Sequence, residues 1–213
     1  MWTTTPWTLP SNLLIMVGND IEYVVVESDF SGTTERYVVG AARLSAYARE
    51  LKNEASESVE DQVVERLTGR DLLGRSYTAP FSYFLGHPHS HRVVEADFVT
   101  TEDGTGLVHS AGAYGEEDKV ITDREGIELV VAVAKDGTFT YPIVDYQGMH
   151  VFDANIAVIE HLKNMTRGEG ETGSVTEGTM LTLTHEQFYD EQARDNHSRG
   201  WNMSLDRLEA LLA

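Results

Sequence analysis

Two short segments of this chain hold the residue types from which a site for a small polar molecule can be built. Residues 2–10 (WTTTPWTLP) crowd hydroxyls, two indoles and two prolines together. Residues 104–109 (GTGLVH) form a glycine-rich turn that leads into a short apolar strand ending on His109, and Asp118 follows. Hydroxyls, an imidazole and a carboxylate in one cleft are suited to hold a molecule that carries an amine.

The elements around these segments predict an α+β domain that is strand-rich and barrel-like, with short peripheral helices. Turn signals and β-branched runs predict strands at residues 12–17, 21–27, 37–39, 92–100 and 106–110, a kinked strand at 72–77, and a hairpin at 129–141. Apolar residues three and four positions apart predict a helix at residues 41–51, and residues 153–165 are typical of an amphipathic helix with Asp153 as its N-cap. A further helix is predicted at residues 115–124, closed by Gly126.

The character of the sequence changes after the polar, glycine-rich residues 167–178, so we expect one domain over residues 1–178 and an appendage over 179–213. The appendage predicts a brief strand and then one long helix with an apolar stripe that includes Trp201, Leu205 and Leu208. This stripe needs a surface to cover, and self-association of two copies through the helix is one way to cover it.

Composition narrows the range of partners. The net charge of −19 argues against a broad basic surface for nucleic acid, although a few local cations suffice to receive one strand end. No apolar run approaches the roughly 20 residues that a membrane-spanning helix needs. The chain has no cysteine, which fits a reducing compartment, and we expect a cytoplasmic protein without a membrane partner.

The two segments resemble the editing domain, connective peptide 1, of isoleucyl-tRNA synthetases. That family carries WTTTPWTLP with an asparagine two residues later, here Asn12, and a GTG segment that ends in VH. It then carries APxxG before an aspartate, where this chain has residues 111–115 and Asp118, and residues 151–155 (VFDAN) match a further segment. The resemblance covers about residues 1–180, whereas residues 181–213 resemble the last strand and helix of a START-like helix-grip domain.

The resemblance implies a proofreading hydrolase that removes valine mischarged on isoleucine tRNA, and that also acts on valyl-adenylate. The partners implied are the 3′ end of that tRNA and valine or valyl-adenylate as the small ligand. No cofactor or metal is implied. The HIGH and KMSKS signatures of the synthetase body are not in these residues, so ligation of amino acid to tRNA is not expected.

Carried over residue by residue, the resemblance gives each side chain a role. The catalytic candidates are Thr5, Thr8, His109 and Asp118. Asp118 would pair with the substrate ammonium, the threonines would donate to the ester carbonyl, the ribose or the attacking water, and His109 would limit the pocket or hold the water. The expected substrate-binding residues are Trp2, Thr3, Thr4, Trp7, Asn12 and Gly106.

Each of these residues also has an ordinary structural explanation, so other interpretations remain open. Threonines are common in strands, a lone histidine often belongs to the core, and a carboxylate near a helix start is favoured by the helix dipole. The alternatives to a hydrolase are a non-catalytic module that binds an amino acid or a tRNA end, and a chimeric scaffold without activity. Gly112 replaces the usual proline of APxxG, which predicts a looser turn before Asp118.

A histidine-rich stretch, His87, His89 and His91, is the one further pattern that could bind a metal, because alternate residues of a strand share a face. Pro88 and the lack of a neighbouring acidic or cysteine ligand favour a surface loop instead.

Overall fold

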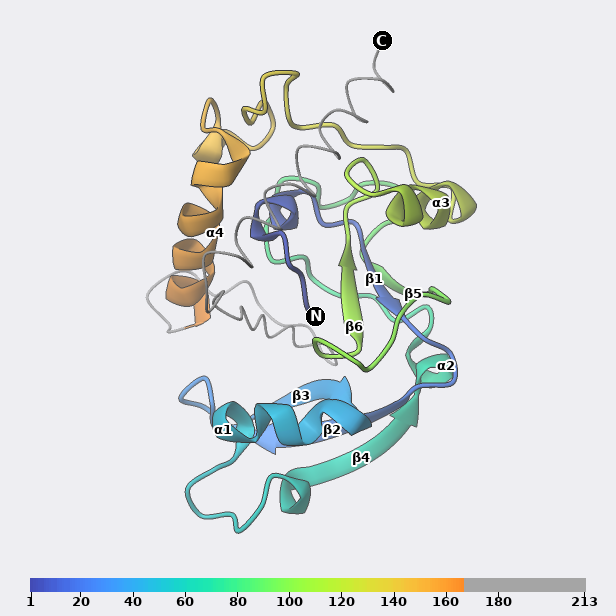
Figure 1. Ribbon diagram of the computed structural model, residues 1–213, viewed down its shortest axis with the longest axis vertical. Helices are drawn as coiled ribbons and strands as arrows, with labels where there is room; N and C mark the ends of the chain where they lie inside the picture. The colour runs from blue at the N-terminus through green and yellow to red at the C-terminus, as the bar shows by residue number, and fades with distance from the viewer. Residues whose placement is uncertain (167–213) are drawn as a thin grey trace.

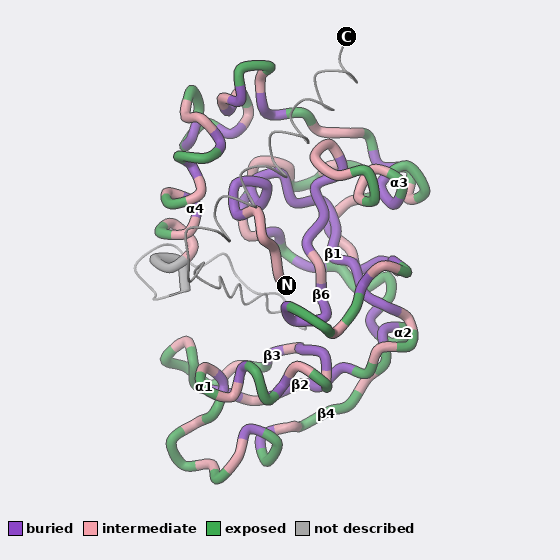
Figure 2. The backbone as a smooth tube through the Cα atoms, viewed as in Figure 1, coloured by how far each residue is buried: buried purple, intermediate pink, exposed green. Residues whose placement is uncertain are grey.

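The computed structural model describes residues 1–166, and Figure 1 shows two small sheets with helices around them. The first sheet has the order β5-β1-β6, built from β1 (Leu14–Val17), β5 (Arg92–Glu95) and β6 (Leu107–Ser110). Strand β1 runs parallel to β5 and antiparallel to β6. All four β1 residues are buried (Figure 2), because neighbouring elements cover both faces of this central strand.

The second sheet is antiparallel and has the order β3-β2-β4. Its strands are β2 (Glu22–Ser28), β3 (Glu35–Gly40) and β4 (Val63–Thr68). The 3₁₀ helix η2 (Ala41–Tyr47) and helix α1 (Ala48–Leu51) pack on it around a small apolar cluster. The remaining short elements on this side are η3 (Glu60–Gln62) and α2 (Gly69–Leu72).

The two sheets are joined through the loop that precedes β6. The hydroxyl of Tyr23 on β2 donates to the carbonyl of Gly106 at 2.7 Å. The N–H of Gly40, at the end of β3, donates to the carbonyl of Thr105, also at 2.7 Å. Gly106 has φ of +78°, a backbone conformation that glycine adopts readily, and a Cβ there would meet Gly40 and Tyr23 at 3.3 to 3.4 Å.

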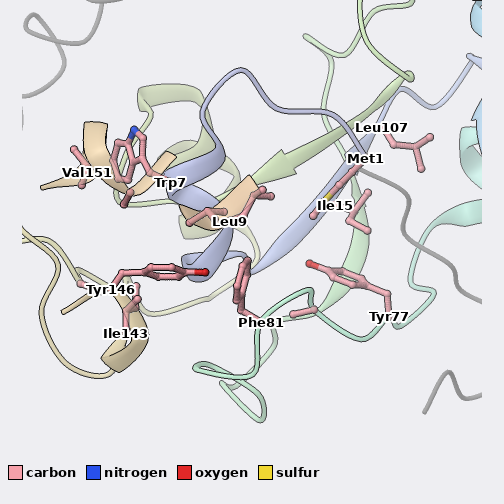
Figure 3. Packing of buried hydrophobic residues seen from close by; sticks show 14 of the residues in the cluster. Met1, Trp7, Leu9, Ile15, Tyr77, Phe81, Leu107, Ile143, Tyr146 and Val151 are labelled. Carbon is pink, nitrogen blue, oxygen red and sulfur yellow. The ribbon is translucent and has the colours of Figure 1, made fainter. Parts of the chain in front are cut away.

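The largest cluster of buried side chains lies between the first sheet and helix α4 (Val151–Thr166). The 3₁₀ helix η1 (Pro6–Ser11) lies between them, and all its residues are buried. Figure 3 shows Trp7 next to Val151 of α4, with Leu9 beneath them. Helix α3 (Glu116–Arg124) and η4 (Val144–Tyr146) complete the described elements.

The α+β class is confirmed, but the sheets of residues 1–166 do not form one closed barrel. Four local predictions were wrong in part. Residues 72–77 follow α2 and retain only an isolated bridge between Ser76 and Arg92. Strand β5 ends at Glu95 rather than near residue 100, and the 129–141 hairpin retains only the bridge between Val133 and Phe139. Helix α4 begins at Val151, so Asp153 lies in its first turn instead of capping it.

The expected domain boundary at residue 178 and the long C-terminal helix lie outside the described residues. None of the helices within residues 1–166 has the length and hydropathy required to cross a membrane.

Candidate active site

A continuous chain of hydrogen bonds connects the threonines of the N-terminal segment to His109. The hydroxyl oxygens of Thr3 and Thr5 are 3.0 Å apart, and those of Thr5 and Thr8 are also 3.0 Å apart. The Thr8 hydroxyl then lies 2.9 Å from Nε2 of His109, which is 101 residues away in the sequence. The structure therefore brings together three of the four predicted catalytic residues, along with Thr3.

The local sequence explains the alignment of the threonines. Pro6 occupies the first position of η1, where its fixed φ suits a helix and its missing N–H costs nothing. In a 3₁₀ helix, side chains three residues apart lie almost directly above one another, so Thr5 at the N-cap faces Thr8. The Thr8 hydroxyl also donates to the Thr5 carbonyl at 2.8 Å, and the Thr5 N–H donates to the Thr3 hydroxyl.

Burial divides this hydrogen-bonded chain into an inner and an outer end. Thr8 and His109 are only 5% and 6% exposed, whereas Thr3 and Thr5 are half-buried. A substrate can therefore contact Thr3 and Thr5 directly, while Thr8 and His109 support them from within.

His109 is a neutral imidazole at the pH of a cell. Burial lowers the pKa of His109 from 6.5 to about 3. Its Nδ1 lies 2.8 Å from the amide nitrogen of Asn12, so both ring nitrogens already have partners inside the protein. A histidine held in this way does not serve as a general base near neutral pH.

We expect this histidine to make folding stability depend on pH. The pKa of His109 is lower in the folded than in the unfolded state, so the unfolded chain binds a proton that the folded chain does not. The contribution of His109 to stability is therefore complete above pH 6.5 and is lost as pH falls toward 3. Between these limits, the free energy of unfolding should fall more steeply in the wild type than in His109→Gln, by at most about 1.4 kcal/mol per pH unit. Urea titrations at several pH values measure both slopes, and equal slopes would contradict the lowered pKa.

Asp118 lies at the end of β6 that also holds His109. It belongs to the first turn of α3, and its Oδ1 accepts the N–H of Ala111 at 3.1 Å. Ala111 follows His109 by two residues and comes directly after the end of β6. Asp118 is half-buried, and this burial raises its pKa, although the Ser110 side chain and the Ala111 N–H oppose the change.

Gly112 packs directly against α3. A Cβ at this position would lie 2.2 Å from the hydroxyl oxygen and 2.8 Å from the Cβ of Thr122, a residue that is fully buried. The Thr122 hydroxyl in turn donates to the carbonyl of Asp118 at 2.7 Å. The glycine, which the sequence suggested would loosen the turn, thus allows a close approach between the turn and the helix that carries Asp118.

The remaining predicted binding residues occupy different places. Trp7 is buried, with its ring edge-on to Tyr114 at 4.9 Å, so it belongs to the core. Trp2 is half-buried, its backbone N–H donates to the carbonyl of Leu107, and its ring lies against the backbone of Gly104. Thr4 is half-buried between Thr3 and Thr5. Gly106 lies at the opposite end of β6 from Asp118, where it contacts the second sheet instead of the threonines.

Three residues that matter to this network were not identified from the sequence. The Tyr77 hydroxyl donates to Oδ1 of Asn12 at 2.6 Å, and Nε2 of His91 lies 3.2 Å from the Asn12 carbonyl oxygen. Asn155 of α4 accepts the N–H of Trp7 at 3.0 Å. The match at residues 151–155 was a signal for Asn155, whereas no short-range pattern connects Tyr77 or His91 with Asn12.

The histidine-rich stretch is a loop, as predicted, but its members have separate environments. His89 is exposed, Nε2 of His87 lies 2.9 Å from the Glu128 carbonyl, and His91 is buried behind Asn12. Within residues 1–166, no three His, Cys, Asp or Glu side chains are grouped so that they could hold a metal ion.

Asn155 should be required to hold η1 in place. Replacing it by leucine leaves the Trp7 N–H without its acceptor at a partly buried position, which we expect to cost about 1 kcal/mol of unfolding free energy. Because Thr8 follows Trp7, the hydroxyl chain should also be displaced. Asn155→Asp keeps an acceptor oxygen and should retain wild-type stability, so equal losses in both variants, measured by thermal unfolding, would argue against this role.

The sequence is similar to parts of known isoleucine–tRNA ligases. Isoleucine–tRNA ligase of Mycobacterium tuberculosis (strain ATCC 25618 / H37Rv) is 46% identical over 175 residues, 82% of this chain and 16% of the ligase. The ligase of Mycobacterium leprae (strain TN) is 44% identical over 189 residues, 88% of this chain and 16% of the ligase. The chain thus spans about one sixth of the length of these relatives.

The fold is similar to that of leucyl-tRNA synthetase editing domains. The crystal structure of GlLeuRS-CP1 matches with a TM-score of 0.59 at 16% identity, covering 76% of this chain and 75% of that one. The editing domain of the P. knowlesi cytosolic leucyl-tRNA synthetase matches with a TM-score of 0.56 at 12% identity, covering 76% of this chain and 80% of that one.

Residues 172–213 match a different family model, described as activator of Hsp90 ATPase homolog 1-like protein. They include the segment for which we expected a helix-grip strand and helix, and they lie outside the described residues. Over more than 80% of its length, the chain is homologous to isoleucine–tRNA ligases, and its fold is that of a connective peptide 1 editing domain. The chain therefore belongs to the isoleucyl-tRNA synthetase family.

Proposed function

We propose that this chain is a proofreading hydrolase that releases valine from mischarged isoleucine tRNA. The observation that carries the proposal is that two groups meet the C-terminal end of β6. The hydroxyl chain of Thr3, Thr5 and Thr8 reaches His109 on this strand, and the Asp118 carboxylate accepts the N–H of Ala111, two residues beyond His109. Homology to isoleucine–tRNA ligases supports an editing module of a tRNA synthetase, and the proposal adds the substrate and the roles of the residues.

Such an activity compensates for a physical limit on how well a binding pocket can distinguish two similar amino acids. A pocket built for isoleucine rejects valine by one methylene, which is worth about 1–3 kcal/mol, and this amino-acid pair is the standard example of that limit. A second site that accepts valine and hydrolyses its ester removes the error. Valyl-adenylate offers the same ammonium and an activated carbonyl, so we include it as a substrate.

In the proposed complex, the carboxylate of Asp118 binds the α-ammonium of valine and so orients the ester carbonyl. A water held at the half-buried hydroxyls of Thr3 and Thr5 attacks the carbonyl carbon. The bond from that carbon to the ribose oxygen breaks, one proton of the water passes to the ribose oxygen, and the other goes to solvent. The products are valine and tRNA with a free terminal hydroxyl.

The protein can promote this hydrolysis by holding the substrate and the water in the right positions. The ester is activated, His109 is held neutral, and the vicinal ribose hydroxyl is available to assist, so we assign no dedicated general base. The partners we propose are the 3′ end of isoleucine tRNA and valine, and the cytoplasm is where charged tRNA is used.

The second candidate is a module that binds an amino acid or a tRNA end without turnover. It is favoured by the burial of Thr8 and His109, whose polar atoms are already occupied within the protein. Binding of valine without release of valine from tRNA would support this candidate.

The test is deacylation of valyl-tRNA with the isoleucine anticodon, with isoleucyl-tRNA assayed alongside and Asp118→Ala as the control. Release of valine but not isoleucine, absent in the variant, is the expected result. No release by a protein that is folded by circular dichroism would reject the hydrolase. Equal release from both tRNAs would reject the proposed selectivity.

A further inference from the structure

Asn12 lies behind the hydroxyl chain, and each polar atom of its side chain is occupied. Its amide nitrogen donates to the Leu14 carbonyl at 3.0 Å and lies 2.8 Å from Nδ1 of His109. Its Oδ1 accepts the Tyr77 hydroxyl at 2.6 Å. Asn12 is 2% exposed, so it has no surface with which to contact a substrate.

The direction of these hydrogen bonds follows from groups that can act only as a donor or only as an acceptor. A backbone carbonyl only accepts, so the atom that faces Leu14 is the NH₂ of Asn12 and not its oxygen. Burial raises the pKa of Tyr77, so its hydroxyl keeps its proton and donates to Oδ1. The NH₂ group therefore also donates to Nδ1 of His109, which must be the unprotonated nitrogen of the neutral ring. The proton of His109 is then on Nε2 and points at Thr8.

The same reasoning continues along the threonines. Thr8 accepts the Nε2 proton and donates its own to the Thr5 carbonyl at 2.8 Å, which is closer than the Thr5 hydroxyl at 3.0 Å. The Thr5 hydroxyl then donates to Thr8. Thr3 accepts the N–H of Thr5 and donates to the Thr5 hydroxyl. All three hydroxyl protons are used, and only lone pairs remain at the half-buried Thr3 and Thr5.

We propose that Asn12 and Tyr77 are positioning residues that hold His109 as a hydrogen-bond donor, so that the threonine hydroxyls meet the substrate as acceptors. This inference rests on the proposed hydrolase function. The threonines accept an O–H of the attacking water or of the ribose, and they do not donate to the ester carbonyl as the sequence suggested. A water that donates one O–H to the protein keeps a lone pair free to attack the carbonyl carbon.

The first test reads the tautomer directly, without any activity. In the full chain labelled with ¹⁵N at histidine, long-range ¹H–¹⁵N spectra at pH 7 distinguish a protonated from an unprotonated ring nitrogen, and His109→Gln identifies the signals of His109. We expect one neutral tautomer with the proton on Nε2. A proton on Nδ1, or an even mixture of the two tautomers, would overturn the proposal.

Two variants then connect the tautomer to the reaction. Asn12→Asp has the same shape but places an acceptor at Nδ1, so the ring proton should move to Nδ1 and deacylation should fall at least 100-fold. Tyr77→Phe removes one hydroxyl and should lower kcat about 10-fold with KM unchanged. Tyr146→Phe is the matched control, because this buried hydroxyl pairs with His161 outside the network, and its activity should stay within twofold of the wild type.

The outcomes separate the inference from the function on which it rests. A wild type that releases no valine but shows the Nε2 tautomer would reject the hydrolase and leave the hydrogen-bond direction standing. An active wild type with the Nδ1 tautomer would reject the positioning role alone. So would an Asn12→Asp protein whose tautomer is reversed while its activity stays within threefold of the wild type. If Asn12→Asp does not fold, two results test the proposal instead. The wild type must show the Nε2 tautomer, and Tyr77→Phe must lower kcat more than Tyr146→Phe does.

Discussion

Replacing Asp118 by asparagine should slow the release of valine by at least about 30-fold while leaving the fold intact. The asparagine oxygen can still accept the N–H of Ala111, so the start of α3 keeps its hydrogen bond. Burial raises the pKa of Asp118, which means that the folded state disfavours its charge, and this contribution to stability is lost as pH rises through the folded pKa. The uncharged variant should therefore be at least as stable as the wild type at pH 7.

The loss of activity should come from the substrate ammonium, which would be left without its counter-charge. Removing one member of a partly buried charged pair costs about 2–5 kcal/mol, which corresponds to a roughly 30-fold to several thousand-fold decrease in kcat/KM. Asp123→Asn is the matched control, since this residue lies on the same helix but forms an exposed pair with Lys119. If Asp118→Asn and Asp123→Asn release valine at the same rate from valyl-tRNA, Asp118 does not bind the ammonium.

Replacing Gly112 by alanine should destabilise the protein and displace Asp118. The new methyl carbon would lie 2.2 Å from the hydroxyl oxygen and 2.8 Å from the Cβ of the fully buried Thr122, and rotation of the Thr122 side chain does not move its Cβ. Overpacking of this kind costs about 1–3 kcal/mol of unfolding free energy. The same shift would break the hydrogen bond from Thr122 to the Asp118 carbonyl, so deacylation should fall as well.

A double-mutant cycle with Thr122→Ala isolates this contact. Thr122→Ala removes the hydroxyl and one methyl group but leaves its Cβ, which is 2.8 Å from the added carbon. The double variant should therefore be less destabilised than the sum of the single variants, with a coupling of about 0.5–3 kcal/mol in urea unfolding. Additive losses would mean that the turn accommodates the methyl group elsewhere.

Much of the candidate site could be predicted from the sequence because its chemistry is concentrated in two short segments. Residues 2–12 hold Asn12 and the three threonines of the hydroxyl chain, and the strand that ends at Ser110 holds His109. The three-residue spacing of Thr5 and Thr8 after a proline is a local property of a 3₁₀ turn. Helix α3 was predicted at nearly its observed bounds because acidic residues in the first turn and a glycine after the last turn mark its ends.

The errors arose where long-range contacts override local pattern. Residues 72–77 suggested a kinked strand, but α2 occupies the beginning of this segment and the Tyr77 hydroxyl donates to Asn12. Gly106 was assigned to the substrate by its motif, yet its conformation serves the contact with Tyr23 of the second sheet. Trp7 was expected to line the substrate pocket, and the packing of Tyr114 and α4 around it makes it part of the core.

The sequence by itself determined the α+β class, the family resemblance, and the residue types that can bind an ammonium and a water. These depend on composition, on periodicity and on spacings within a few residues, which are properties of the local chain. Only the tertiary structure decided which groups are exposed, which polar groups hydrogen-bond to one another, and that Tyr77 and Asn155 take part. Burial and the choice of hydrogen-bond partner depend on groups tens of residues away, because a buried polar group is satisfied by whichever group the fold brings to it.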